Sequence, residues 1–138
     1  MKLFDTNVFI YARGRPSPYR DPCIALFAEA GRNPDAYGID VEVLQELLDV
    51  YSRRGDRAIA VRVIEESLGV FPDPFPVTRR EIEEAADIVK GYRRLSPRDA
   101  IHAAVCRTYG LEGIVSAEKA FDRVAGFTRF DPLKMAGR

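Results

Sequence analysis

Acidic residues in four separated regions carry the chemistry that this 138-residue sequence suggests. They are Asp5, Glu46, Asp99 and Glu118. Three of these regions place an acid where a strand meets a helix, and ligands of open parallel sheets bind at that edge. A site made only of carboxylate oxygens suits Mg²⁺ or Mn²⁺ rather than zinc. The four acids are therefore candidate ligands of a divalent cation.

Asp5 and Asp99 each have a structural alternative. Asp5 in MKLFDTNVF follows a short apolar stretch and could simply cap the next helix. Asp99 in SPRDAIHAAVC could complete a capping box that begins at Ser96. Helical spacing, however, places Asp99 above Ala103 and Cys106 on an apolar surface. A lone carboxylate there is costly unless it is paired or binds a cation, so Asp99 is favoured as functional.

Glu46 and Glu118 are less distinctive on local evidence. Glu46 in VEVLQELLDVY falls at the margin of the buried stripe of its helix, and periodicity does not separate it from its acidic neighbours. Glu118 in IVSAEKAFD lies in a first helical turn, where it complements the helix dipole and Ser116 can act as the cap. Both residues could be ordinary solvated glutamates.

The single histidine, His102, argues against a histidine-ligated metal or a serine–histidine hydrolase. It follows Asp99 by three residues and is expected to fill a helix interface. Cys23 and Cys106 form neither a disulfide framework nor a zinc-ligand pattern.

Short strands alternate with longer helices, which indicates an α/β fold with a parallel sheet covered on both faces. Expected strands are 2–4, 37–39, one within the proline-rich 71–77, 114–115 and 127–130. Expected helices begin near Asn7 and cover 21–30, 40–53, 56–68, 78–90, a segment from Ser96 to Gly110, and 117–124.

Composition places the chain among ordinary globular proteins, with one domain expected over residues 1–138. Basic and acidic residues number 21 each, so net charge favours neither nucleic acid nor membrane. Most of the basic residues are arginine, which suits phosphate contacts. No apolar run approaches the length of a membrane span, and Asp5 interrupts any signal peptide. A cytoplasmic location without a membrane partner is expected.

Four segments together resemble the PIN domain family, in particular VapC-type toxins of prokaryotic toxin–antitoxin pairs. The segments are FDTNVFIYA (4–12), VEVLQELLDVY (41–51), LSPRDAIHAAVC (95–106) and IVSAEKAFDRVAGFTRFDP (114–132). The resemblance implies a three-layer α/β/α sandwich around a five-stranded, mainly parallel sheet. It covers nearly the whole chain in the expected order.

The resemblance also implies a Mg²⁺- or Mn²⁺-dependent endoribonuclease holding one or two ions. Asp5, Glu46 and Asp99 match the acidic positions of the family. Glu118 takes the fourth, with Asp122 as a weaker substitute because Ala120 stands where many members have aspartate. Thr6, Asn7 and Ser116 match polar positions around the site. Implied partners are RNA, a cognate antitoxin and a second copy in a homodimer.

Three other interpretations remain open. A housekeeping RNA-processing nuclease would use the same fold and acids. A degenerate PIN scaffold would bind RNA or protein without cleavage, as the departures at Glu118 and Ala120 would allow. A phospho-receiver domain would also place acids at strand ends, but Asp5 is followed by Thr6 and Asn7 rather than by a second acid.

Overall fold

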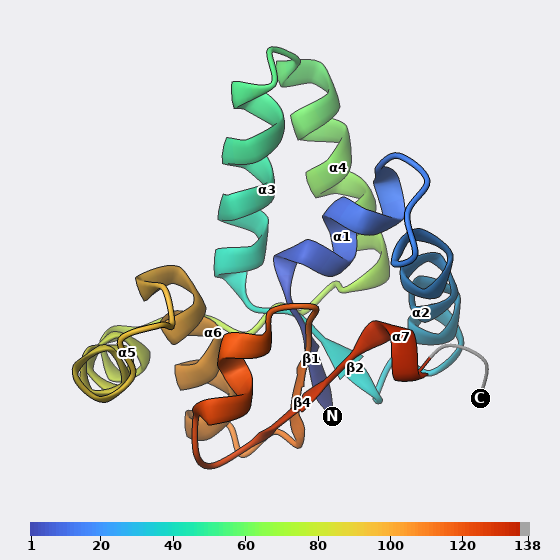
Figure 1. The fold of residues 1–138 in the computed structure, drawn as a ribbon. Helices are drawn as coiled ribbons and strands as arrows, with labels where there is room; N and C mark the ends of the chain where they lie inside the picture. Colours follow the sequence, from blue (N-terminus) through green and yellow to red (C-terminus); the bar gives the residue numbers. More distant parts are fainter. Residues whose placement is uncertain (136–138) are drawn as a thin grey trace.

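Side chains of the central strands alternate between two faces, and this alternation divides the core in two. The computed structural model describes residues 1–135, so the end of the predicted 1–138 domain lies outside the described residues. Phe4 and Val115 belong to one buried cluster, whereas Leu3 and Ile114 belong to the other. Helices cover both faces of the sheet, so the predicted three layers are present (Figure 1).

The sheet has four strands in the order β2-β1-β3-β4, and every neighbouring pair is parallel. The strands are β1 (Lys2–Phe4), β2 (Tyr37–Gly38), β3 (Gly113–Val115) and β4 (Thr128–Phe130). The chain moves from β1 to β2 on one side and later returns to β3 on the other. The order therefore reverses at β1, and the crevice between the carboxyl ends of β1 and β3 is the expected ligand site.

The prediction of five strands was wrong by one. Within the proline-rich stretch, only Phe75 pairs, through a single parallel bridge to Asp40. Pro74 and Pro76 flank Phe75 and have no N–H to donate, so the pairing cannot extend into a ladder.

The predicted helices are confirmed in order, with small shifts at their ends. The four helices after β1 and β2 pack on the first core, and α5, α6 and η1 pack on the second. The bounds are α1 (Thr6–Arg13), α2 (Arg20–Arg32), α3 (Val41–Arg53), α4 (Arg57–Val70), α5 (Arg79–Gly91) and α6 (Pro97–Thr108). The predicted helix 117–124 is the short 3₁₀ helix η1 (Lys119–Arg123), and α7 (Pro132–Met135), which packs near α2, was not predicted.

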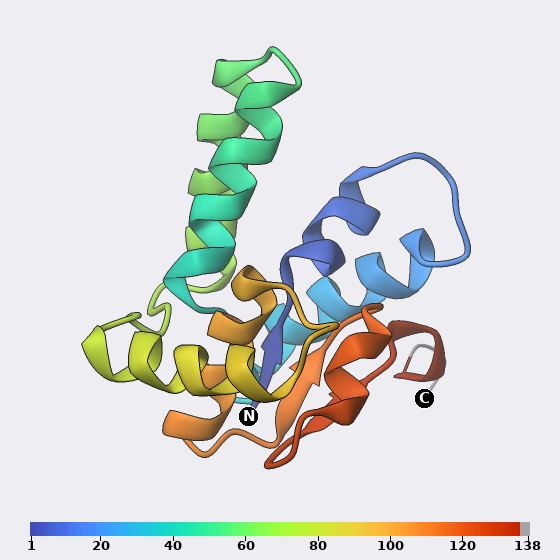
Figure 2. The same ribbon diagram turned by 60° about the vertical axis from the view of Figure 1, so that its left-hand side comes forward.

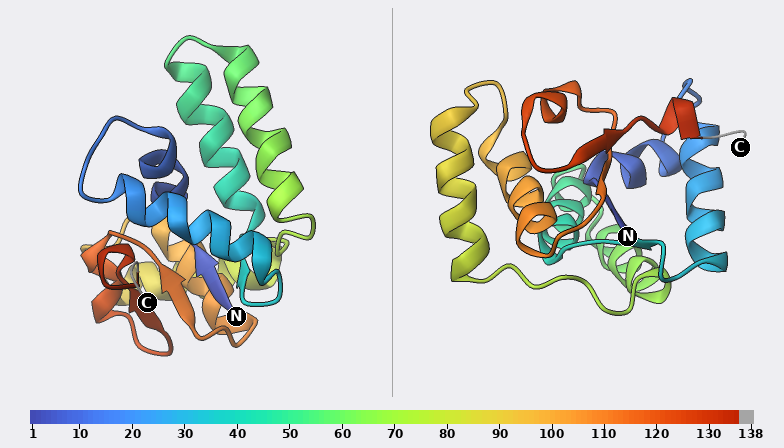
Figure 3. Two further views of the ribbon diagram at one scale, coloured as in Figure 1. Left: turned by 90° about the vertical axis from the view of Figure 1, so that its right-hand side faces the viewer. Right: turned by 90° about the horizontal axis from the view of Figure 1, so that it is seen from below.

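The α3–α4 pair extends well beyond the sheet, as Figures 2 and 3 show. The first residues of α3 nevertheless lie near the carboxyl end of β1, so its first two turns can contribute side chains there. None of the helices within residues 1–135 is long and apolar enough to cross a membrane.

Candidate metal centre

Asp5 lies where the strand order reverses and is 4% exposed. Its Oδ1 accepts a hydrogen bond from the Thr6 N–H at 2.7 Å, and its Oδ2 accepts one from the Ser116 hydroxyl at 2.6 Å. The Asn7 amide donates to the same Ser116 hydroxyl at 3.0 Å. The polar residues expected around the site thus lie beside Asp5 and restrict the orientation of its carboxylate.

Asp99 approaches Asp5 from the first turn of α6. The Ser96 hydroxyl accepts from the Asp99 N–H at 3.1 Å, so the helix is capped as the sequence predicts. One ligand atom from each of Asp5, Asp99 and His102 lies within 4.8 Å of the others. Burial, followed by the charge on Asp5, raises the pKa of Asp99 to about 7. A carboxylate in this position gains from a nearby cation.

Glu46 reaches the same centre from the second turn of α3. Its Oε1 lies 2.9 Å from Nε2 of His102, and that nitrogen lies 3.7 Å from Oδ1 of Asp5. The Glu46 side chain is only 12% exposed. The three acids carried over from the resemblance, Asp5, Glu46 and Asp99, therefore converge around one imidazole.

Sequence reasoning missed one member of the cluster, Asp40, and the partners of another, His102. His102 fills the interface between α3 and α6 as expected, but its Nδ1 lies 2.7 Å from Oδ2 of the fully buried Asp40. Asp40 also caps α3, where its Oδ1 accepts from the Val43 N–H at 3.0 Å. The sequence did contain a sign that Asp40 belongs to the site, because Asp40 follows the predicted strand 37–39 just as Asp5 follows the first strand.

Burial and mutual charge perturb the whole cluster. Burial alone would lower the pKa of His102, but Asp40, Glu46 and Asp5 raise it well above its usual range. Burial raises the pKa of Asp5, although His102 and the Ser116 hydroxyl oppose that effect. The pKa of Glu42 is also raised, by burial and then by Glu46. The centre therefore places several carboxyl groups around a single imidazole ring, that of His102.

The remaining predicted acids have local partners instead. Glu118 is exposed, and its Oε1 accepts from the Ala120 N–H at 3.0 Å, which caps η1. Asp122 pairs with Arg129 at 2.8 Å. Within residues 1–135, the side chains of these two acids form no direct hydrogen bond or ion pair with Asp5 or Asp99. The backbone N–H of Glu118 donates to the Ser116 hydroxyl, which donates to Asp5.

The residues at this centre fit a divalent cation. Their donors are carboxylate oxygens, the ligands that Mg²⁺ and Mn²⁺ prefer. The buried Thr6 hydroxyl has no hydrogen-bond partner in the described part of the chain. An unpaired hydroxyl beside clustered carboxylates is suited to bonding with the water that a hydrated cation retains.

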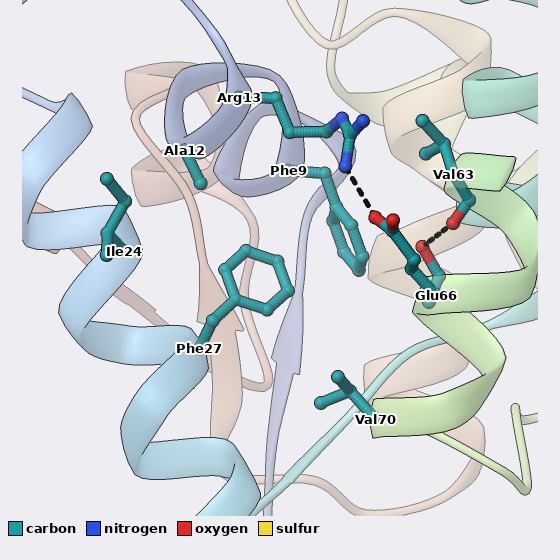
Figure 4. A pocket seen from close by; sticks show the side chains of 9 residues that line it. Phe9, Ala12, Arg13, Ile24, Phe27, Val63, Glu66 and Val70 are labelled. Carbon is teal, nitrogen blue, oxygen red and sulfur yellow. Dashed lines mark hydrogen bonds and ion pairs between the residues drawn. The ribbon is translucent and has the colours of Figure 1, made fainter. Parts of the chain in front are cut away.

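A separate apolar groove lies between α1, α2 and α4 (Figure 4). Its volume is about 240 Å³, and Phe9, Phe27 and Val63 are among its lining residues. Arg13 and Glu66 form an ion pair of 2.7 Å at the groove. This surface contains none of the clustered acids.

Comparison with known proteins identifies the family to which the chain belongs. The PIN domain family model matches residues 2–127. Ribonuclease VapC13 of Mycobacterium tuberculosis is 30% identical over 129 residues, which cover 94% of this chain and 98% of that protein.

Two solved structures share the fold. FitAcB from Neisseria gonorrhoeae has a TM-score of 0.75 at 17% identity, and a toxin–antitoxin complex from Klebsiella pneumoniae has 0.69 at 19%. Each comparison covers 96% of this chain and 98% of the other. The chain therefore belongs to the PIN domain family, in which its relatives are VapC ribonucleases.

Proposed function

We propose that this protein is a metal-dependent endoribonuclease and the toxin of a type II toxin–antitoxin pair. The observation that carries the proposal is the convergence of Asp5, Glu46 and Asp99 on one centre from three separate elements. The similarity to proteins named ribonucleases supports the choice of RNA as the substrate.

Asp5, Glu46 and Asp99 would hold Mg²⁺ or Mn²⁺. A bound ion supplies Lewis acidity that activates water and offsets charge on the scissile phosphodiester. Asp5 is pre-oriented by the Thr6 N–H and the Ser116 hydroxyl, so little side-chain freedom is lost when it binds. Glu118, at the start of η1, is the candidate to hold a second ion.

The Ser116 hydroxyl at the centre is fully buried and donates to Asp5, so it is not free to act as a nucleophile. Asp99 binds a proton near neutral pH when no cation is present, and cation binding favours its ionised form. The buried Thr6 hydroxyl, on the residue that follows Asp5, is the candidate donor to a water molecule that the ion retains. These groups bind and orient, and they leave the nucleophile to come from water.

Arginines on the loop before α6 and on η1 are suited to hold RNA phosphates. Arg93, Arg94 and Arg123 line a hollow of about 210 Å³ between the loop that leads into α6 and η1. All three are exposed, and within the described chain none forms an ion pair. By contrast, Arg13 pairs with Glu66 and Arg98 lies 3.7 Å from Asp49. We assign the hollow to RNA phosphates because arginine's planar fork matches them.

The apolar groove is the proposed seat of the antitoxin. Apolar pockets that open to the surface favour the binding of apolar groups. The groove offers aromatic and aliphatic walls with a charged pair at one side, which suits an apolar side chain from a peptide that also carries charge. Ala12→Asp should reduce antitoxin binding while leaving RNA cleavage unchanged.

A second copy would pack on α5. Ile82, Ala86 and Val89 are exposed at helical spacing on its outer face. Ile82 is 49% exposed and Val89 41% exposed, and α5 lies at the edge of the molecule (Figure 3). Sedimentation of Ile82→Asp tests this surface, because a buried aspartate would dissociate the dimer.

Incubation of the purified chain with mixed RNA tests the proposed activity. We expect cleavage with Mg²⁺ or Mn²⁺, none after chelation, and none by Asp5→Asn or Asp99→Asn. Equal cleavage by the wild type and both variants would contradict the catalytic assignment. Absence of cleavage in every sample would instead favour a scaffold that binds without cutting.

The toxin role needs a separate measurement in cells. Expression of the chain should stop growth, and coexpression of the cognate antitoxin should restore it. Cleavage without growth arrest would favour a housekeeping nuclease.

A further inference from the structure

Three side chains from two helices form a continuous hydrogen-bonded chain at the candidate metal centre. Asp40 caps α3, Glu46 lies six residues further along the same helix, and His102 lies in α6. The ring nitrogens of His102 lie 2.7 Å from Asp40 Oδ2 and 2.9 Å from Glu46 Oε1. Asp40 and His102 are both fully buried.

We propose that Asp40 and His102 are positioning residues that hold the Glu46 carboxylate toward Asp5 and Asp99. This inference rests on the proposed function, because Glu46 then completes the cation site. His102 acts through Glu46 rather than as a ligand of the ion.

The Asp40 carboxylate holds the His102 ring on the side opposite Glu46. Asp40 uses one oxygen to cap α3 at the Val43 N–H and the other to accept from His102 Nδ1. With both oxygens engaged, the Asp40 carboxylate cannot rotate without losing a buried hydrogen bond. The ring plane is fixed in turn, and its Nε2–H points at Glu46.

The fixed ring restrains a side chain that would otherwise be free. Glu46 has three rotatable bonds and lies at the margin of the buried face of α3. Nε2 of His102 contacts the Glu46 carboxylate and turns it inward. The same nitrogen lies 3.7 Å from Oδ1 of Asp5, so the Glu46 and Asp5 carboxylates are held near each other. Outer hydrogen bonds of this kind orient metal ligands and typically change affinity by about 10–100-fold.

The same contacts argue against His102 as a ligand. Carboxylates accept hydrogen bonds and cannot donate them, so a ring facing one on each side donates from both nitrogens. A ring with two N–H groups has no lone pair left for a cation. The positive ring also offsets the repulsion among Asp5, Glu46 and Asp99.

Nitrogen NMR of His102 tests its hydrogen bonds to Asp40 and Glu46, which we call the histidine bridge. The signals need no residue assignment, because the chain contains one His. With ¹⁵N-histidine, we expect a directly bonded proton on both ring nitrogens in metal-free protein. Both protons should remain after Mg²⁺ is added. A ring nitrogen without a proton in the metal-free protein would overturn the bridge, and loss of the Nε2 proton with Mg²⁺ would make His102 a ligand instead.

Calorimetric titration with Mn²⁺ tests the positioning. Asp40→Asn keeps an oxygen that can cap α3, but it replaces the charged oxygen that faces His102 with an uncharged amide group. The His102 ring is then held less firmly and positions Glu46 less well, so Mn²⁺ affinity should fall about 10–100-fold. Asp56→Asn is the matched control. Asp56 caps α4 through the Ile59 N–H at 3.0 Å, as Asp40 caps α3, and it is not part of the centre. Wild-type affinity in Asp40→Asn would overturn the proposal.

A double-mutant cycle separates positioning from a general structural effect. If Asp40 acts through Glu46, then Asp40→Asn should change Mn²⁺ affinity by less than about threefold in a Glu46→Gln background. An equal loss in both backgrounds would overturn the assignment. Should Asp40→Asn not fold, His102→Gln replaces it in the same cycle.

The outcomes distinguish the two levels of inference. No Mn²⁺ binding by the wild type would contradict the proposed function itself. Tight binding by both the wild type and Asp40→Asn would overturn only the positioning role.

Discussion

Asp5 and Glu118 follow β1 and β3, which are neighbouring strands that end at the same edge of the sheet. The two acids nevertheless meet different surroundings. Asp5 is buried and faces Asp99 and His102, whereas Glu118 is exposed and accepts from the Ala120 N–H. Asp122, one turn beyond Glu118, pairs with Arg129. We call Asp5, Glu46 and Asp99 the inner acids, and Glu118 and Asp122 the outer acids.

An acid that follows a strand therefore lies at the carboxyl edge of the sheet, but this position alone does not bring it into the candidate metal centre. Inner acids project between α1, α3 and α6, where Asp5 is buried and Glu46 and Asp99 are partly buried. Outer acids lie on η1 and its cap, where the backbone and an arginine offer bonds that do not require a cation. We expect removal of an inner acid to have the larger effect on cation binding and catalysis.

Asp5→Asn and Asp99→Asn carry the largest expected effect. Each amide keeps the size of the side chain and removes the charge that would hold the ion. RNA cleavage should fall at least about a hundredfold, the scale seen when one electrostatic stabiliser is lost. Single-turnover cleavage rates with saturating Mg²⁺ measure this effect. A loss below tenfold for both variants would end the distinction between inner and outer acids.

Thermal unfolding should show a cation effect that grows with pH. Because the pKa of Asp99 is raised to about 7, the metal-free folded chain binds this proton more tightly than the unfolded chain does. The resulting stability is present below about pH 4 and is lost as pH rises through about 7.

A cation replaces the proton, so Mg²⁺ should raise Tm more at pH 8 than at pH 5. At a hundredfold excess over its Kd, the rise at pH 8 should be of the order of 3–10 °C. Asp99→Asn should remove this pH dependence, and Glu118→Gln should retain it. The opposite pattern would show that the outer acids bind the ion more strongly.

Glu118→Gln should have a smaller effect on cleavage. Glutamine keeps the oxygen that accepts from the Ala120 N–H, so η1 stays capped. A loss of no more than about tenfold is expected if Glu118 only assists a second ion. A Mg²⁺ titration of cleavage rate measures the effect. A hundredfold loss would mean that Glu118 leaves its capping position and joins the inner acids.

Asp122→Asn has the smallest expected effect. The substitution weakens an ion pair whose aspartate is 53% exposed. The free energy of unfolding should fall by less than about 1 kcal/mol, and cleavage should be unchanged. Urea unfolding with a parallel cleavage assay checks both. Impaired cleavage in a stable variant would place Asp122, rather than Glu118, in the fourth acidic position.

Local patterns in the sequence predicted most elements because each pattern lies within a single element. The helix expected over 78–90 is α5, which begins with a capping box of Thr78 and Glu81, and Ser96 caps α6 as expected. The prediction failed for the strand expected around Phe75, because whether a segment forms a strand depends on its pairing with another segment. Glu46 could be selected only through the resemblance, since its helical position alone does not distinguish it from Glu42.

The sequence by itself determined the alternation of strands and helices and the acids at their junctions. Only the tertiary structure decided which acids face one another. His102 is separated from Asp40 by 62 positions and from Glu46 by 56, and helical periodicity carries no information over such distances. Those contacts depend on how α3 packs against α6, because that packing aims side chains from both helices at the carboxyl end of β1.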